Sequence, residues 1–333
     1  MLETNKIDDF AATLEEATRS TREGVKYFIE PAQGTLSRAK SKRHHLIFGR
    51  RGSGKSSLLN KLVSEFNLSR TPVAYIDLET FKGHSYPDVL VSILIKTLSS
   101  YEKWMETAAI LPGSKQSFWE KLFGKKPTRK ALDKGEVAKV SNSINKIKVE
   151  LEHLLSEAET IDRTRTARQS LAKGGEGTAS LDGPSSNLSA KATISKETEK
   201  EIVDTYENKK IEILHRRILE FKDLFEKISA CADGSSYILL DDLYHIRKSD
   251  QAMVIDYFHR ITKGTDTWLK IGTIKHRTKW YTTGTQAIGV KLGDDADEID
   301  LDVTLERYDL TKKFLIRILQ RKLIKFLGIY RPP

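Results

Sequence analysis

Residues 49–56, GRRGSGKS, have the residue types and the spacing of a phosphate-binding loop. Gly49 is followed after four residues by Gly54, Lys55 and Ser56, which fits the pattern G-x-x-x-x-G-K-[S/T] at every fixed position. The glycines let the backbone curl, so that successive N–H groups point at a phosphate. We expect Lys55 to bridge the outer phosphates of a nucleotide and the Ser56 hydroxyl to take one position on Mg²⁺.

The segments on either side of this loop are those that the chemistry requires. Residues 44–49, HHLIFG, are typical of a short buried strand, and residues 55–66, KSSLLNKLVSEF, of an amphipathic helix. The N-terminus of that helix adds a partial positive charge beside the phosphates. The residues expected to bind the nucleotide are therefore Gly49, Arg50, Arg51, Gly52, Ser53, Gly54, Lys55, Ser56 and Ser57.

A site of this kind also needs a carboxylate from a neighbouring strand to orient Mg²⁺ and the attacking water. The apolar run from Tyr237 to Leu240 ends in Asp241 and Asp242. We expect Asp241 to hold Mg²⁺ through water. Asp242 takes the place where many ATPases carry the glutamate that polarises water, although an aspartate is one methylene shorter. The alternative is that the Asp-Asp pair simply caps the next turn.

The composition and net charge of the chain limit the compartments in which it can work and the partners that it can bind. A single cysteine, Cys231, excludes an intramolecular disulfide and a cysteine-based metal cage. The N-terminus has no signal-peptide pattern, and no stretch approaches the roughly 18 apolar residues needed to span a bilayer. We therefore expect a cytoplasmic protein without a membrane partner. The net charge of +10 favours acidic partners such as DNA or RNA, although many soluble proteins are basic for no specific reason.

Further apolar, β-branched runs indicate the rest of a sheet. They are PVAYIDL at 72–78, WLKIGTI at 268–274 and IDLDVTL at 299–305, each separated from the next by helical patterns. Such alternation predicts an α/β fold in which a parallel sheet is flanked by helices on both faces. With the strands before the loop and before Asp241, the sheet has five strands.

Five segments together resemble the AAA+ and STAND class of P-loop ATPases, nearest the origin-recognition and archaeal-type ATPases. These segments are GRRGSGKSSLL, VAYIDLET, YILLDDLYH, LKIGTIKHR and DLDVTLERYDL. The resemblance implies a P-loop NTPase fold with strand order 5-1-4-3-2, ATP and Mg²⁺ as ligands, and assembly into oligomers. It places Thr273 at the position that senses the γ-phosphate. It makes Arg277 and Arg307 both candidates for an arginine that contacts the nucleotide of a neighbouring subunit. The alternative for each is an ordinary surface arginine.

The chain between Asp77 and Asp241 is far longer than one crossover helix requires. Apolar residues recur three and four positions apart in two series, which is typical of heptad seams. The first is Val137, Val140, Ile144, Ile147, Leu151, Leu154, Ala158 and Ile161, and the second is Ile211, Leu214, Ile218, Phe221, Phe225 and Ile228. We expect an inserted antiparallel helical hairpin that projects from the core, with a flexible tip at 172–195. The alternative is a pair of ordinary core helices.

These patterns divide the chain into three parts. Residues 1–111 hold an N-terminal helix and the first half of the core, residues 112–230 the insert, and residues 231–333 the second half of the core. Within the insert, residues 115–130 interleave aromatic and basic side chains, which suits nucleic acid, an anionic surface, a partner's groove or the chain's own core. A basic amphipathic helix near the C-terminus is expected to pack its apolar stripe as a lid.

The function that these features favour is an ATP-binding and ATP-hydrolysing oligomeric switch or motor. Its expected partners are further copies of the chain, assembled with ATP, DNA or RNA, and an effector protein at the helical arm, as in DNA transactions or antiviral defence. An SMC/ABC-like ATPase is an alternative, although LAKGGEG at 171–177 matches its LSGGQ signature poorly. A GTPase would need an N-K-x-D motif, and a scaffold locked by ATP would need no hydrolysis.

Overall fold

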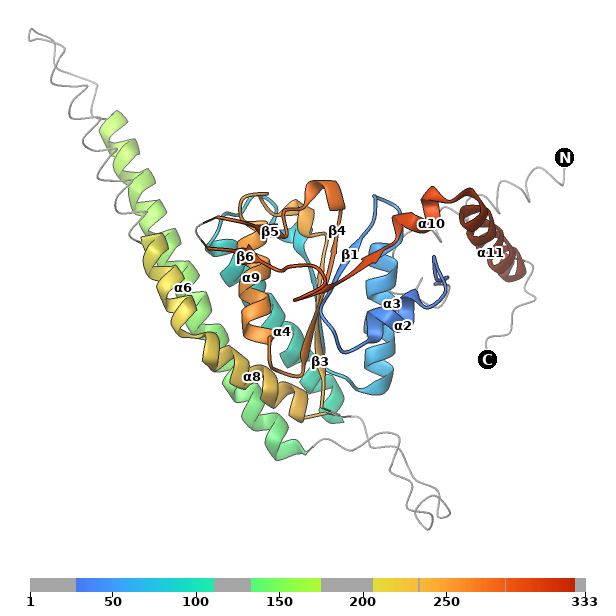
Figure 1. The fold of residues 1–333 in the computed structure, drawn as a ribbon. Helices are drawn as coiled ribbons and strands as arrows, with labels where there is room; N and C mark the ends of the chain where they lie inside the picture. The colour runs from blue at the N-terminus through green and yellow to red at the C-terminus, as the bar shows by residue number, and fades with distance from the viewer. Residues whose placement is uncertain (1–27, 111–132, 175–205, 233, 285, 327–333) are drawn as a thin grey trace, which may run out of the picture.

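The computed structural model describes residues 28–110, 133–174, 206–232, 234–284 and 286–326. At its centre lies a five-stranded parallel sheet with helices on both faces (Figure 1). Its strands are β1 (His45–Phe48), β2 (Val73–Asp77), β3 (Ser236–Asp241), β4 (Thr267–Thr273) and β7 (Asp297–Asp300). They lie in the order β2-β3-β4-β1-β7, which confirms the α/β class, the parallel sheet and the expected strand order.

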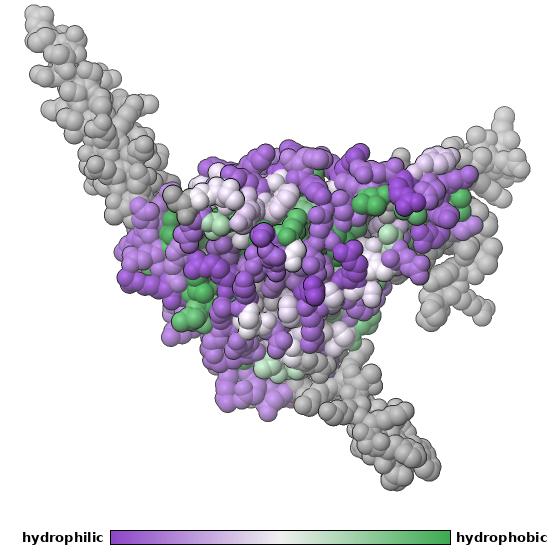
Figure 2. All heavy atoms as spheres, viewed as in Figure 1, coloured by the Kyte–Doolittle hydropathy of each residue, from purple (hydrophilic) through white to green (hydrophobic). Residues whose placement is uncertain are grey.

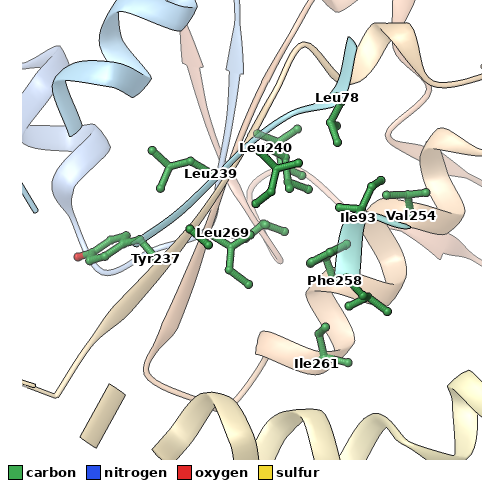
Figure 3. Packing of buried hydrophobic residues seen from close by; sticks show 14 of the residues in the cluster. Leu78, Ile93, Tyr237, Leu239, Leu240, Val254, Phe258, Ile261 and Leu269 are labelled. Atoms are coloured by element: carbon green, nitrogen blue, oxygen red, sulfur yellow. The ribbon is translucent and has the colours of Figure 1, made fainter. Parts of the chain in front are cut away.

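Helices cover the sheet because its strands are apolar on both sides. Helices α2 (Thr35–Lys40) and α3 (Lys55–Ser69) lie on one face, and α4 (Asp88–Ile110) and α9 (Gln251–Thr262) lie on the other (Figure 1). Along β3, Tyr237 and Leu239 point to the first face and Leu240 to the second (Figure 3). The Tyr237 ring stacks on Phe66 of α3 with 3.9 Å between centroids. The core is therefore two apolar layers that share one sheet.

The remaining described elements are short, apart from the insert and the last helix. They are η2 (Leu78–Phe81), η3 (Leu243–His245), η4 (Lys275–Arg277), β5 (Tyr281–Thr282), β6 (Ile288–Gly289), α10 (Asp302–Glu306) and α11 (Tyr308–Phe326). Strands β5 and β6 form a separate antiparallel pair. Within the described residues, no helix is both long and apolar enough to cross a membrane. The face seen in Figure 2 is mainly hydrophilic, and its apolar residues form small separate spots.

The fifth strand lies earlier in the chain than predicted. The strand expected at 299–305 is wrong beyond residue 300, because α10 begins at Asp302. The Asp300 carboxylate accepts a hydrogen bond of 2.9 Å from the Asp302 backbone N–H, which satisfies an amide at the start of that helix. The apolar pattern that predicted a strand at 299–305 therefore covers the end of a strand and the start of a helix.

Two long helical segments form the insert, as predicted. Helix α6 (Lys134–Gly174) runs antiparallel to a helix over residues 206–216 and its continuation α8 (Ile218–Ala230) (Figure 1). The prediction that this hairpin projects from the core holds only for the far part of α6. In the near part, the seam residues Val140, Ile144 and Leu151 are buried in the common core.

Ion pairs attach the insert to α4 as well. Lys148 of α6 pairs with Glu102 of α4, and Lys210 pairs with Asp88 at the start of α4 at 2.6 Å. Arg217 pairs with Glu150 at 2.7 Å and so joins the two arms of the hairpin. The near part of the insert therefore packs against the domain as one of its layers, and only the far part of α6 projects as an arm.

Other predicted features fall outside the described residues or differ from them. The N-terminal helix within 1–27, the basic-aromatic segment at 115–130 and the tip from residue 175 to 195 lie outside the described residues. The lid expected of the C-terminal helix is wrong for the described part of α11, because Leu315 and Leu319 are 50% and 48% exposed. Helix α11 lies beyond α10, away from the sheet (Figure 1).

We expect Ile144→Ala to lower the free energy of unfolding by about 2–5 kcal/mol, because Ile144 is fully buried beside α4. Val149 lies on the same helix but is 55% exposed, so Val149→Ala should change the stability by less than about 0.5 kcal/mol. Urea unfolding followed by circular dichroism measures both. Equal effects would mean that α6 does not belong to the core.

Candidate functional site

The loop between β1 and α3 has a backbone that only glycine adopts easily. Gly52 and Gly54 have φ values of 82° and 94°, in the left-handed region that disfavours other residues. A Cβ placed on Gly49 would lie 2.1 Å from Ser53 Oγ, so this position also excludes a side chain. The Gly49 N–H donates to Thr273 O at 3.2 Å, which anchors the loop to the end of β4.

Lys55 is the first residue of α3 and is buried beneath the loop. Its Nζ donates hydrogen bonds to Gly49 O at 2.9 Å and to Arg50 O at 3.0 Å. Burial lowers the pKa of the Lys55 ammonium, while the charges of Asp242 and Asp241 oppose that shift. The lysine therefore sits between loop carbonyls and two carboxylates.

Asp241 ends β3 and is almost completely buried. Its carboxylate accepts hydrogen bonds from the Tyr75 hydroxyl and from the Asp242 backbone N–H, both at 2.9 Å, and from the Ser56 hydroxyl. Burial, together with the charge of Asp242, raises the pKa of Asp241 to about 6. These contacts bring together the two predicted metal ligands, Ser56 and Asp241, across α3 and β3.

Gly272 provides the room for this carboxylate. It lies in β4, and a Cβ on it would approach Asp241 Oδ1 to 2.8 Å and Leu59 Cδ1 to 3.0 Å. Sequence reasoning passed over Gly272 because no motif marks it. A glycine in the middle of an apolar strand is nevertheless a known sign of a close approach.

A hollow of about 180 Å³ opens above the loop at the carboxyl ends of β2 and β3. Its lining residues are Arg51, Gly52, Gly54, Lys55, Ser56, Ser57, Glu79, Asp242 and Tyr244. Asp242 has a left-handed φ of 56°, and burial raises the pKa of its carboxyl while Lys55 opposes the shift. The predicted Arg51, Lys55, Ser56, Ser57 and Asp242 thus share one hollow.

Glu79 and Tyr244 line the hollow, and sequence reasoning missed both. Each follows the end of a strand, Glu79 in η2 after β2 and Tyr244 in η3 after β3. Because parallel strands place their carboxyl ends at one edge of the sheet, residues just beyond two neighbouring strands come close together. The position of Glu79 and Tyr244 just after two neighbouring strands was therefore the signal that could have predicted their place at the site.

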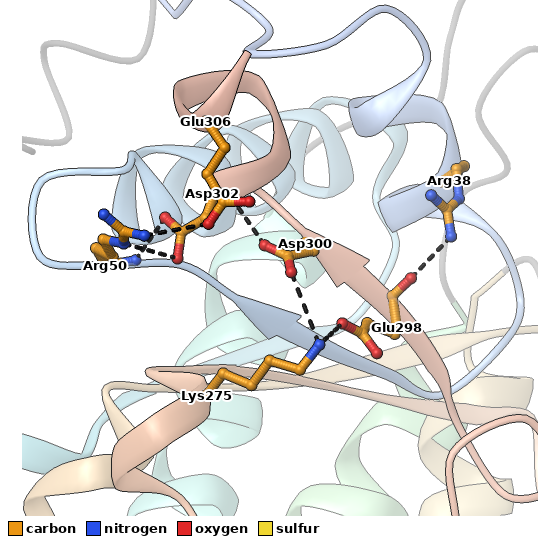
Figure 4. A network of polar contacts seen from close by, with 7 residues as sticks. All are labelled: Arg38, Arg50, Lys275, Glu298, Asp300, Asp302 and Glu306. Atoms are coloured by element: carbon orange, nitrogen blue, oxygen red, sulfur yellow. Dashed lines mark hydrogen bonds and ion pairs between the residues drawn. The ribbon is translucent and has the colours of Figure 1, made fainter.

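The Arg50 side chain turns away from the hollow. Its guanidinium pairs with Glu306 at 3.1 Å and with Asp302 at 3.9 Å, and its backbone N–H donates to Asp302 Oδ1 at 2.8 Å (Figure 4). Ser53 is buried, and its Oγ has no hydrogen-bond partner among the residues that the structure describes. The two loop residues therefore have different roles. Arg50 connects the loop to α10 by ion pairs and a hydrogen bond, and Ser53 packs inside the loop.

The three residues assigned by resemblance occupy different places. Thr273 is fully buried at the end of β4, and its hydroxyl bonds to that of Thr278 rather than lining the hollow. Arg277 is exposed and lies over the Tyr244 ring, with its Cζ 5.4 Å from the centroid. Arg307 follows α10 and pairs with Asp309 at 3.4 Å. Of the two arginines, only Arg277 contacts a residue of the hollow in the described structure.

The metal-binding capacity of the site is limited to oxygen ligands. In the part of the chain that the structure describes, no three His, Cys, Asp or Glu side chains converge on one point. Ser56 and Asp241 supply one hydroxyl and one carboxylate. Mg²⁺ commonly takes one or two protein oxygens and completes its shell with phosphates and water.

Comparison with known proteins assigns no family to this fold and site. The chain matches no protein-family model, no curated protein and no solved structure. The structure itself defines an α/β domain with a five-stranded parallel sheet and a polar hollow at the carboxyl ends of its strands. One fold can host many functions, so the chemistry of the residues at the site indicates the function of this chain.

We expect Gly272→Ala to lower the free energy of unfolding by about 1–3 kcal/mol, because the added methyl group displaces the Asp241 carboxylate or Leu59. Gly284→Ala is the control, since a Cβ there meets Gln286 O at an ordinary 3.7 Å. Thermal unfolding of both variants measures the difference. A Gly272→Ala protein as stable as the control would show that the packing around Asp241 is loose.

Proposed function

We propose that this chain binds ATP together with Mg²⁺ and hydrolyses it, acting as an oligomeric switch. The observation that carries the proposal is the placement of Lys55. Its buried ammonium lies at the first turn of α3, under a glycine loop and beside Asp241 and Asp242. A cation beside the backbone N–H groups of a glycine loop and a helix N-terminus suits the negative charge of a polyphosphate.

The surroundings of Lys55 also fit a phosphate chain. The backbone of Gly52 and Gly54 is in the left-handed region, and the hollow above the loop includes Arg51 as a second cation. Buried Ser53 Oγ has no partner, so the loop interior retains an unused donor. We infer that the phosphates lie along this loop.

The residues beside the loop fit Mg²⁺. The Ser56 hydroxyl and the Asp241 carboxylate are hard oxygen ligands, and both are held in place by their mutual hydrogen bond. When bound, the ion neutralises charge that develops on the phosphate oxygens. The Tyr75 hydroxyl and the Asp242 N–H keep the Asp241 carboxylate oriented towards Ser56.

In this proposal Lys55 releases the carbonyl oxygens of Gly49 and Arg50 and pairs with the outer phosphates. A carboxylate in the hollow then accepts a proton from the attacking water. Asp242 and Glu79 are both available for this step, and Glu79 has the longer side chain. Arg277, which lies over Tyr244 at the hollow, is our choice over Arg307 for the arginine that acts between subunits.

The proposed partners are further copies of the chain, nucleic acid and an effector protein. Further copies of the chain would meet at the rim of the hollow near Arg277. DNA, RNA or an effector protein would use the basic surface or the far part of α6. A scaffold locked by ATP is the second candidate function, and the residue type of Asp242 favours it, because aspartate is one methylene shorter than the glutamate that many ATPases carry at this place.

We expect Lys55→Ala to abolish binding of a fluorescent ATP analogue, measured by anisotropy with Mg²⁺ present. Lys61→Ala is the matched control, because Lys61 lies on the same helix and pairs only with surface Glu65 at 2.9 Å among the contacts described for it. The control should bind like the wild type. Retention of wild-type affinity by Lys55→Ala would refute nucleotide binding at this loop.

We expect Asp242→Asn to lower the turnover number by about 10²–10⁴-fold while nucleotide affinity stays unchanged, if Asp242 is the general base. Asparagine tolerates the left-handed φ of this position, so the backbone is preserved. Glu79→Gln is assayed beside it, and the loss should fall on one of the two. A wild-type protein that binds ATP and never releases phosphate would establish the scaffold instead.

A further inference from the structure

Helix α11 presents an apolar face that no other described element covers. Tyr308, Leu315 and Leu319 are 80%, 50% and 48% exposed. Residues seven and four positions apart lie on the same side of a helix, so these three side chains form one stripe. Ile316 beside them is 42% exposed. Lys312 also lies on this side, four residues after Tyr308 and three before Leu315, and its aliphatic stem can lie along the stripe. An apolar stripe on a helix that stands away from the sheet is a mark of an interaction surface.

Asp309 in the first turn of α11 pairs with Arg307, and beyond that turn the charge around the stripe is of one sign. Residues 310–333 contain no acidic residue, and their basic residues are Lys312, Lys313, Arg317, Arg321, Lys322, Lys325 and Arg331. Lys313 and Arg317 are one turn apart on the side opposite Tyr308 and Leu315, and both are exposed. Beyond its first turn, helix α11 therefore has an apolar side, on which Lys312 also lies, and an opposite side that is cationic.

The occupant of this surface must accept both faces. A second copy of α11 would bring two strongly cationic helices together, which like-charge repulsion disfavours. Nucleic acid would neutralise the basic side chains and leave the apolar stripe in water. The surface of an anionic bilayer takes the apolar stripe among the acyl chains and the basic side chains among the headgroups.

We propose that α11 binds the surface of an anionic membrane, lying in the plane of the interface. This contact is not a membrane span, since no described helix is apolar enough to cross a bilayer. The sequence-based expectation of no membrane partner depended on the lack of an apolar run long enough to span a bilayer, and a helix that lies on the membrane surface does not need such a run. The proposal requires no nucleotide and is independent of the proposed ATPase.

The test is co-sedimentation of the whole chain with vesicles, without nucleotide. One set is phosphatidylcholine alone, and the other is phosphatidylcholine mixed with phosphatidylserine. We expect the wild type to sediment with the anionic vesicles only. Leu315→Ser with Leu319→Ser should weaken this binding by roughly tenfold or more, and Lys313→Gln with Arg317→Gln by about fivefold for each charge removed.

Leu219→Ser is the matched control, because Leu219 is 75% exposed on α8 and lies outside the stripe. It should bind anionic vesicles like the wild type, and circular dichroism verifies that every variant is folded. If the serine variants bind anionic vesicles as strongly as the wild type, the net charge of the chain causes the binding, and the proposal is overturned. So would sedimentation with both vesicle types or with neither.

The other occupants give different results. If α11 pairs with a second copy, light scattering shows a wild-type dimer that the serine variants convert to a monomer, while vesicles are not bound. If it binds nucleic acid instead, duplex DNA is bound equally by the wild type and the serine variants and is lost in the glutamine variants, while vesicles are not bound. If it binds an acidic protein groove, both vesicle sets leave the wild type in solution. Each of these outcomes overturns the proposal.

Discussion

A buried carboxylate at the end of β3 constrains the elements around it. Asp241 lies away from water, so each of its oxygens needs a donor, and an unpaired charge there would be very costly. The donors come from three places: Tyr75 on β2, Ser56 on α3 and the backbone of Asp242. Gly272 on β4 leaves the space. The register of β2 and β4 beside β3 and the position of the first turn of α3 all meet at this one group.

The loop before α3 depends on a second buried charge. Lys55 donates hydrogen bonds to the carbonyl oxygens of Gly49 and Arg50, so the loop closes around the lysine. On its outer side, Arg50 connects the same loop to Asp302 and Glu306 of α10, and Lys275 joins Glu298 and Asp300 nearby (Figure 4). These contacts connect the loop to α10, which leads directly into α11.

The helical insert illustrates how one pattern serves two kinds of packing. A seam of apolar residues three and four apart is satisfied by a partner helix or by the side of a domain. In α6, Ile144 and Leu151 are buried with α4 and the core, and the ion pair between Lys148 and Glu102 reinforces that contact. Periodicity alone does not reveal which surface the seam meets, because both surfaces bury the same face.

The sequence by itself determined the features that follow from local chemistry. The glycine spacing predicted the loop, apolar runs predicted five parallel strands, and the need for a carboxylate beside Mg²⁺ predicted that Ser56 and Asp241 would lie at one site. Only the tertiary structure decided which distant residues join them. Glu79, Tyr244 and Gly272 reach the site through the sheet's register, which no short motif encodes. Whether an apolar stripe is covered, as in α6, or left open, as in α11, depends on long-range packing, and a helical pattern is the same in both cases.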